Sequence, residues 1–168
     1  MNQSDVTPSR RQFLKSGLLN PAAFLLPSGL SLAQDVKPPA ALSSDLVKEF
    51  VVKAHGDFKR TQEMLQEQPG LLNASWDWGG GDFEMGIEGA GHVGNKEIAT
   101  FLISKGARMT IFVATMLGHL DTVKTILTRY PEMIHARGPH GLTYLHHARK
   151  GGAEALAVLE YLQSLGAT

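Results

Sequence analysis

Four histidines toward the C-terminal end of the chain are the first candidates for chemistry: His135, His140, His146 and His147. Imidazole nitrogens bind zinc and other transition metals. Adjacent residues on a helix point about 100 degrees apart, so His146 and His147 do not readily share one ion. The chain has no cysteine and no HExxH motif to complete a site. We therefore expect no metal and no cofactor, with a small metal-dependent hydrolase that uses His140, His146 and His147 as the alternative.

The carboxylate and serine side chains likewise give no indication of an active site. Asp82 and Glu84, or Glu84 and Glu88, could act as an acid and a base, but their spacing is equally typical of a solvated surface, which we expect here. No serine lies in a GxSxG nucleophile elbow. We predict no catalytic residue, and we interpret His92 and His119, near expected turns, as groups that bridge loops without a ligand.

Both tryptophans lie in one segment, Trp76-Asp77-Trp78, which is followed by three glycines, Asp82 and Phe83. The glycine run lacks the lysine and the serine or threonine of a P-loop, so it is not a phosphate cradle. The rings are either anchors for a partner on a flexible finger or a cover for the groove between the first two helix pairs. We favour the second interpretation, in which the glycines permit a tight hairpin.

Four pairs of helices are predicted from apolar residues at helical spacing and from glycines between the two helices of each pair. The expected pairs cover about 46–66, 85–104, 111–129 and 144–165. Because a short helix pair cannot bury its apolar face alone, the pairs are expected to stack into a continuous core. The two longest connections, 69–84 and 131–141, are expected to carry recognition residues.

The segment from Gly141 to Ala148 resembles T-P-L-H-x-A, the opening motif of an ankyrin repeat, with Tyr144 in place of proline. The chain is also similar to bacterial ankyrin-type proteins that contain WDWG and GPHG segments, here at 76–79 and 138–141. This resemblance implies an all-α, ankyrin-type helix-pair solenoid of about four imperfect repeats over 45–168. It gives His146 the role of the motif histidine that bonds neighbouring loops. The glycine spacing is irregular, and the junction between the second and third pairs is too short for a full hairpin.

The N-terminus contains Ser-Arg-Arg-Gln-Phe-Leu-Lys, followed by an uncharged stretch from Ser16 to Ala33. This pattern resembles a bacterial twin-arginine signal peptide over residues 1–33, read at Arg10, Arg11, Phe13, Leu14 and Lys15 and cleaved after Ala33, with a linker over 34–44. The resemblance implies a periplasmic location and export of the folded protein, a route often used by proteins that carry a cofactor. A retained membrane anchor is the alternative, although two prolines and an asparagine make this stretch a poor membrane-spanning helix.

The overall charge argues against nucleic acid as a partner, because 16 basic residues are balanced by 16 acidic ones. The expected function is a non-catalytic protein–protein interaction module that contacts the twin-arginine translocase during export and another, periplasmic protein afterwards. The predicted partner surface comprises Trp76, Asp77, Trp78, Asp82, Phe83, His140 and Tyr144.

Overall fold

The computed structural model describes residues 40–168, which form one compact unit, Ala40–Thr168. These residues are mostly helical, and their one sheet has two strands, which confirms the predicted all-α class. The predicted signal peptide over 1–33 and the linker up to residue 39 lie outside the described residues. None of the helices within the described part is long and apolar enough to cross a membrane.

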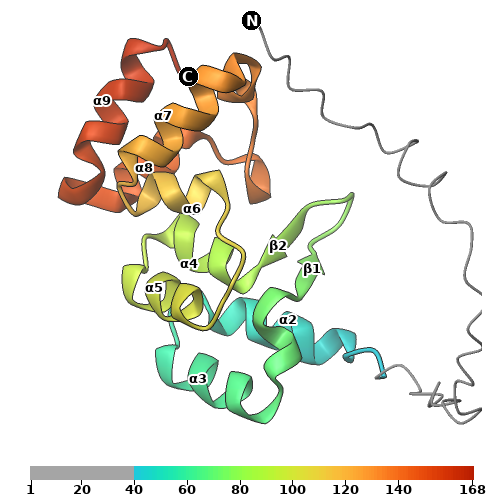
Figure 1. Cartoon of the computed structure of the whole chain (residues 1–168). Coiled ribbons are helices and arrows are strands. Elements are labelled where there is room, and N and C mark those ends of the chain that lie inside the picture. Colours follow the sequence, from blue (N-terminus) through green and yellow to red (C-terminus); the bar gives the residue numbers. More distant parts are fainter. Residues whose placement is uncertain (1–39) are drawn as a thin grey trace, which may run out of the picture. The chain divides into compact units, whose positions relative to one another are not determined.

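The helices form four consecutive pairs within the described residues, close to the ranges expected from the sequence (Figure 1). The pairs are α2 (Ser44–Lys53) with α3 (Phe58–Glu67), α4 (Gly86–Val93) with α5 (Lys96–Ser104), α6 (Ile111–Met116) with α7 (Leu120–Arg129), and α8 (Tyr144–Gly151) with α9 (Leu156–Ser164). Short 3-10 helices lie at η1 (Pro69–Asn73), η2 (Pro131–His135), η3 (Pro139–Gly141) and η4 (Gly152–Ala155). Several helices begin where a polar side chain accepts a hydrogen bond from a free backbone N–H: Ser43, Asp57, Asn95, Thr110 and Thr143.

The first helix of each pair packs on the first helix of the next, so that α2 contacts α4, α4 contacts α6 and α6 contacts α8. Of the second helices, α3 packs against α5 and α7 against α9. In addition, α4 contacts α8 directly. The fourth helix pair therefore lies against the second as well as the third.

Glycines let α4 approach α2 closely. A Cβ on Gly86 would lie 2.8 Å from a ring carbon of Phe50, and a Cβ on Gly89 would lie 2.6 Å from a ring carbon of His55. Phe50 is fully buried at this contact, in a core cluster shared by the first two helix pairs. The close approach places the turn after α2 directly beside the C-terminal half of α4.

A β-hairpin precedes α4, formed by β1 (Ser75–Asp77) and β2 (Phe83–Met85) (Figure 1). The strands are antiparallel, with Trp76 opposite Glu84. The three glycines of the connection all have positive φ, at 120°, 67° and 87°, a region that side-chain-bearing residues rarely adopt. The tight hairpin expected from the glycine run is confirmed.

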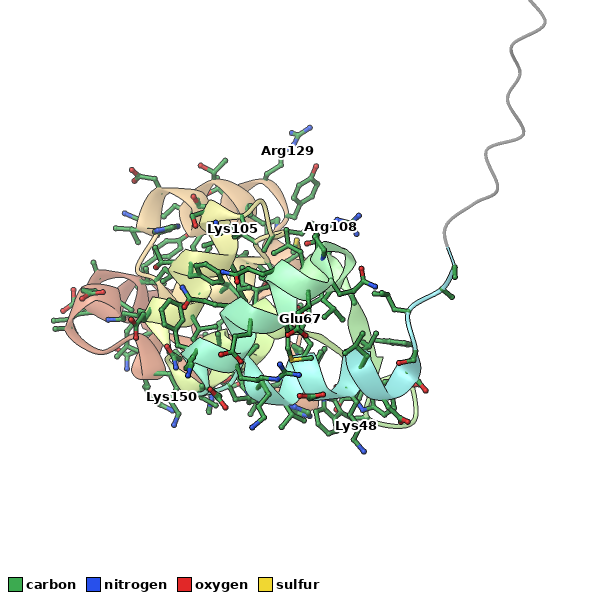
Figure 2. All side chains as sticks on the ribbon, turned by 90° about the horizontal axis from the view of Figure 1, so that it is seen from below. Lys48, Glu67, Lys105, Arg108, Arg129 and Lys150 are labelled. Carbon is green, nitrogen blue, oxygen red and sulfur yellow. The ribbon has the colours of Figure 1, made fainter. Side chains whose placement is uncertain are left out.

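Charged side chains lie at the periphery of this fold. Lys48, Arg129 and Lys150 are exposed and extend outward from the ribbon (Figure 2). Histidine and carboxylate side chains are instead concentrated where the hairpin, α4 and η3 meet.

Candidate metal centre

Four side chains from separate parts of the sequence converge on one point: His55, Glu84, His92 and His140. Each offers one ligand atom, and all four atoms lie within 4.8 Å of one another. The Nε2 atoms of His55, His92 and His140 lie 3.6, 3.5 and 3.5 Å from Oε1 of Glu84. The cluster therefore has one carboxylate oxygen that faces three imidazole nitrogens at nearly equal distances.

Two of the histidines are placed by the first two helix pairs. His55 lies in the turn between α2 and α3, where its Nδ1 is 2.8 Å from the carbonyl oxygen of Val51, and its ring occupies the space left by Gly89. His92 lies in the last turn of α4, and its ring is in edge contact with that of His55, with centroids 4.7 Å apart. The α2–α4 packing therefore determines where both rings lie.

Glu84 is fully buried, although it lies on a short, two-stranded hairpin. Its Oε2 accepts a hydrogen bond of 2.8 Å from the indole N–H of Trp78. Its Oε1, in contrast, has no hydrogen-bond partner. The same holds for Nε2 of His92, and among the described residues the only other such buried side-chain atom is the hydroxyl of Tyr144. Because buried polar groups are usually paired, this concentration at one point calls for an explanation.

His140 reaches the cluster from η3 and is held there by Asp82. The two carboxylate oxygens of Asp82 lie 2.8 Å from the backbone nitrogen and 2.8 Å from the ring Nδ1 of His140. His140 has φ 60°, and it is the one non-glycine residue with positive φ among the described residues. Strained backbone of this kind persists where the surroundings impose it, and it concentrates at functional sites. The Asp82 carboxylate therefore orients the His140 ring toward Glu84.

The hydrogen bond that Nδ1 makes determines whether Nε2 of the same ring carries a proton or a lone pair. A carbonyl oxygen only accepts, so the Nδ1 of His55 must donate to Val51, and the Nδ1 of His140 donates to the carboxylate of Asp82. In the neutral rings, Nε2 then carries a lone pair that points toward Glu84. Lone pairs and a buried carboxylate oxygen repel one another, and a cation between them would remove the repulsion.

Burial and hydrogen bonding shift the pKa values of two residues in this group. Burial, assisted by the neighbouring histidines, lowers the pKa of His92 to about 4, so its ring is neutral near pH 7. The hydrogen bond from the backbone N–H of His140, followed by that from its ring, lowers the pKa of Asp82 and keeps that carboxylate ionised. Carboxylate–histidine pairs of this type orient the metal-binding histidines of many proteins.

The alternative cluster expected from the sequence is not formed. His140 joins His55, Glu84 and His92, whereas the two helical histidines have other contacts. Nε2 of His146 lies 2.8 Å from the carbonyl oxygen of His92, so it bonds the last turn of α4 in the second helix pair and not a neighbouring loop as expected. Nδ1 of His147 lies 2.9 Å from the carbonyl oxygen of Thr143 in its own helix.

One expectation about a single residue was wrong, and a second describes its residue only in part. Glu84 was expected on a solvated surface, yet it is fully buried, because the hairpin folds its carboxylate inward against α4 and the histidines. His92 was interpreted as a loop-bridging group without a ligand. Its carbonyl oxygen does bridge to α8, but its ring points into the cluster. No sequence pattern marks these residues together, because the four side chains come from four different parts of the fold. The signal that was available is the alternation Asp82-Phe83-Glu84, which places both carboxylates on one side of a strand.

The predicted partner surface is divided by the structure. Asp77, Trp78 and Phe83 are exposed, whereas Tyr144 is only 1% exposed and cannot contact a partner, because it stacks on Phe112 in the core. Trp76 packs partly buried against the first core cluster, in agreement with the preferred covering role. The remaining predicted contacts, Asp82 and His140, belong to the histidine–carboxylate cluster.

Comparison with known proteins adds no further constraint, since no protein-family model, no curated protein and no solved structure matches the chain.

Proposed function

We propose that this protein binds one divalent transition-metal ion between His55, Glu84, His92 and His140. The observation that carries the proposal is the unpartnered, fully buried Oε1 of Glu84 with three imidazole nitrogens 3.5–3.6 Å away. Without an ion, these atoms present negative charge and lone pairs to one another around the fully buried carboxylate of Glu84. With an ion, all four become ligands.

The donor set favours a metal of the zinc group over magnesium or calcium. Three imidazole nitrogens and one carboxylate oxygen suit zinc, copper, iron and nickel, whereas calcium and magnesium prefer oxygen ligands throughout. In His55 and His140, Nδ1 donates a hydrogen bond to an acceptor, as is usual for metal-binding histidines.

Isothermal titration of the metal-free, full-length chain with zinc tests the proposal. We expect one ion per chain. His55→Ala and His92→Ala should each weaken binding by more than the roughly 10–100-fold that follows loss of an outer hydrogen-bond partner. His135→Ala, which removes an exposed histidine outside the cluster, is the matched control. Equal affinity in all four proteins would refute the proposed site.

For the scaffold and its location, we propose an ankyrin-type solenoid that is exported to the periplasm by the twin-arginine route. Stacked helix pairs, the motif-like contact from His146 and the arginine pair at the N-terminus support this proposal. Export of a folded protein is also the route that suits an ion bound by elements far apart in the sequence. Replacing Arg10 and Arg11 by lysine should retain the full-length chain in the cytoplasm, and unchanged periplasmic recovery would contradict this.

Binding of a periplasmic protein partner is a second candidate function, with a specific observation in its favour. Phe83 is 58% exposed and Trp78 is 39% exposed, both on the hairpin. Large exposed aromatic side chains are enriched at protein interfaces. Crosslinking in periplasm with wild-type protein and with Phe83→Ser tests it: capture of one protein by the wild type alone is expected, and equal capture by both refutes a role for this hairpin.

A non-catalytic role is proposed in both cases. A small hydrolase, the alternative, would use the cluster of His55, Glu84, His92 and His140. Of the three histidines first considered for it, only His140 belongs to this cluster.

A further inference from the structure

We infer that the proposed metal site is a closed, tetrahedral zinc site with four protein ligands, which fastens the hairpin and η3 to the first two helix pairs. This inference rests on the proposed function, because it requires an ion at the cluster. Beyond the proposed function, we specify the coordination geometry, the metal and the structural role of the ion. A closed site stabilises structure, whereas a catalytic zinc keeps a position open for water or substrate.

The distances between donor atoms support tetrahedral coordination. With zinc–nitrogen and zinc–oxygen bonds of about 2.0–2.2 Å, two ligands at the tetrahedral angle lie about 3.3–3.5 Å apart. The same bonds at a right angle, as in octahedral coordination, give about 3.0 Å. Oε1 of Glu84 lies 3.5, 3.5 and 3.6 Å from the three Nε2 atoms. All three distances are close to a tetrahedral edge. The four ligand atoms lie within 4.8 Å of one another, so any pair of nitrogens wider than a tetrahedral edge would have to close when the ion binds.

Glu84 can contribute only one oxygen to the ion. Its Oε2 is already engaged by the indole N–H of Trp78 at 2.8 Å. The carboxylate is therefore held in an orientation that presents Oε1 alone to the three histidines. Four protein donors, one from each residue, complete a tetrahedral shell without a water ligand.

The charges of the site balance when zinc is bound. The two positive charges of the ion are compensated by the carboxylate of Glu84, which contacts the ion, and by that of Asp82, which bonds the ring of His140. The three histidines would add no charge, because an imidazole that binds a metal does so in its neutral form. A site without net charge avoids most of the desolvation penalty of an isolated ion.

Three of the ligands come from parts of the fold that already pack together, whereas His140 comes from η3, which has few other contacts with them. His55 follows α2, Glu84 belongs to β2, His92 ends α4, and His140 lies in η3, just before the fourth helix pair. The bond between Asp82 and His140 joins residues 58 positions apart. An ion at the centre would therefore hold both long connections of the chain in one conformation, and the exposed hairpin residues with them.

Replacement of zinc by Co²⁺ tests the coordination directly, because tetrahedral Co²⁺ absorbs visible light intensely whereas six-coordinate Co²⁺ absorbs weakly. The full-length, metal-free chain is titrated with Co²⁺, and sodium azide is then added as a competing ligand. We expect an intense spectrum that saturates at one equivalent, is bleached by zinc and does not change with azide. Weak absorption, or a spectrum that shifts with azide, would show an open site and overturn the closed geometry.

The fastening role has a separate readout in amide hydrogen exchange. Zinc is expected to slow exchange in residues 76–84 and 138–142 of the wild type, and to leave exchange in α9 unchanged. His55→Ala is the matched variant in which both segments should exchange as in the metal-free protein. Zinc binding that leaves these segments unaffected would refute the fastening role while preserving the proposed function. Absence of any zinc or cobalt binding would refute both.

Discussion

Replacing Glu84 by glutamine should have opposite effects on the metal-free and the zinc-loaded protein. In the metal-free wild type, the buried Oε1 faces three nitrogen lone pairs and accepts no hydrogen bond. The amide of glutamine is nearly isosteric, its NH₂ group can donate to an imidazole nitrogen, and its oxygen can still accept from Trp78. The variant therefore removes an unsatisfied buried charge without creating a cavity.

The magnitude follows from the cost of leaving a buried polar group unpaired, about 1–3 kcal/mol. For a domain of about 130 residues, 1 kcal/mol corresponds to roughly 4 °C in Tm. Metal-free Glu84→Gln should therefore melt about 4–12 °C above the metal-free wild type. Zinc at about 1,000 times its Kd should raise the wild type by about 4 kcal/mol, or roughly 16 °C, and should leave the variant unchanged. The order of stability is then reversed by zinc.

Thermal unfolding with a chelator and with excess zinc measures both effects. Glu160→Gln provides the control, since this exposed glutamate on α9 should give wild-type behaviour in both conditions. A metal-free Glu84→Gln protein that melts below the wild type would refute the proposed repulsion at Oε1. A variant that gains as much stability from zinc as the wild type would refute Glu84 as a ligand.

Three further predictions concern neighbouring features. Asp82→Asn should weaken zinc binding about 10–100-fold in calorimetry, because the loop histidine is no longer held by a carboxylate, and unchanged affinity would contradict its orienting role. Burial lowers the pKa of His147, so below pH 6.5 the unfolded chain binds a proton that the folded chain resists. Stability in urea should consequently fall as pH decreases from 6.5, less steeply in His147→Gln, and equal slopes would contradict the buried neutral ring. Gly151→Ala should cost at least about 2 kcal/mol, because the new Cβ would collide with the backbone carbonyl of Met116, whereas Gly56→Ala, which meets no atom within 4 Å, should not. Similar stabilities for the two alanine variants would contradict this packing.

The helix pairs were predictable because local patterns specify them. Apolar spacing and polar caps such as Asn95 and Thr143 act within a few residues, and the observed helices begin and end close to the expected positions. The hairpin was likewise indicated by three consecutive glycines, each of which adopts a positive φ.

The cluster was not predictable from the same patterns, because its formation depends on tertiary packing. His55 and His92 meet only because Gly89 lets α4 approach the turn after α2. His140 meets them only because Asp82, far away in the sequence, bonds both its backbone and its ring. Local rules instead drew attention to His146 and His147, which are adjacent in sequence but have separate structural partners.

The inward orientation of Glu84 could not be predicted from the local sequence either. A glutamate next to an aspartate and an exposed phenylalanine has the local composition of a surface turn, and sequence alone favours solvation. Its burial follows from strand alternation together with the bond to Trp78, which turns the carboxylate away from solvent. Neither the pairing register nor that bond is encoded in a short motif.

The most direct test of the account is a crystal structure of the zinc-soaked protein with an anomalous difference map at the zinc absorption edge. We expect one strong peak surrounded by Oε1 of Glu84 and the Nε2 atoms of His55, His92 and His140, each about 2.0–2.2 Å from the ion. An unoccupied cluster, or zinc bound instead at His146 and His147, would contradict it.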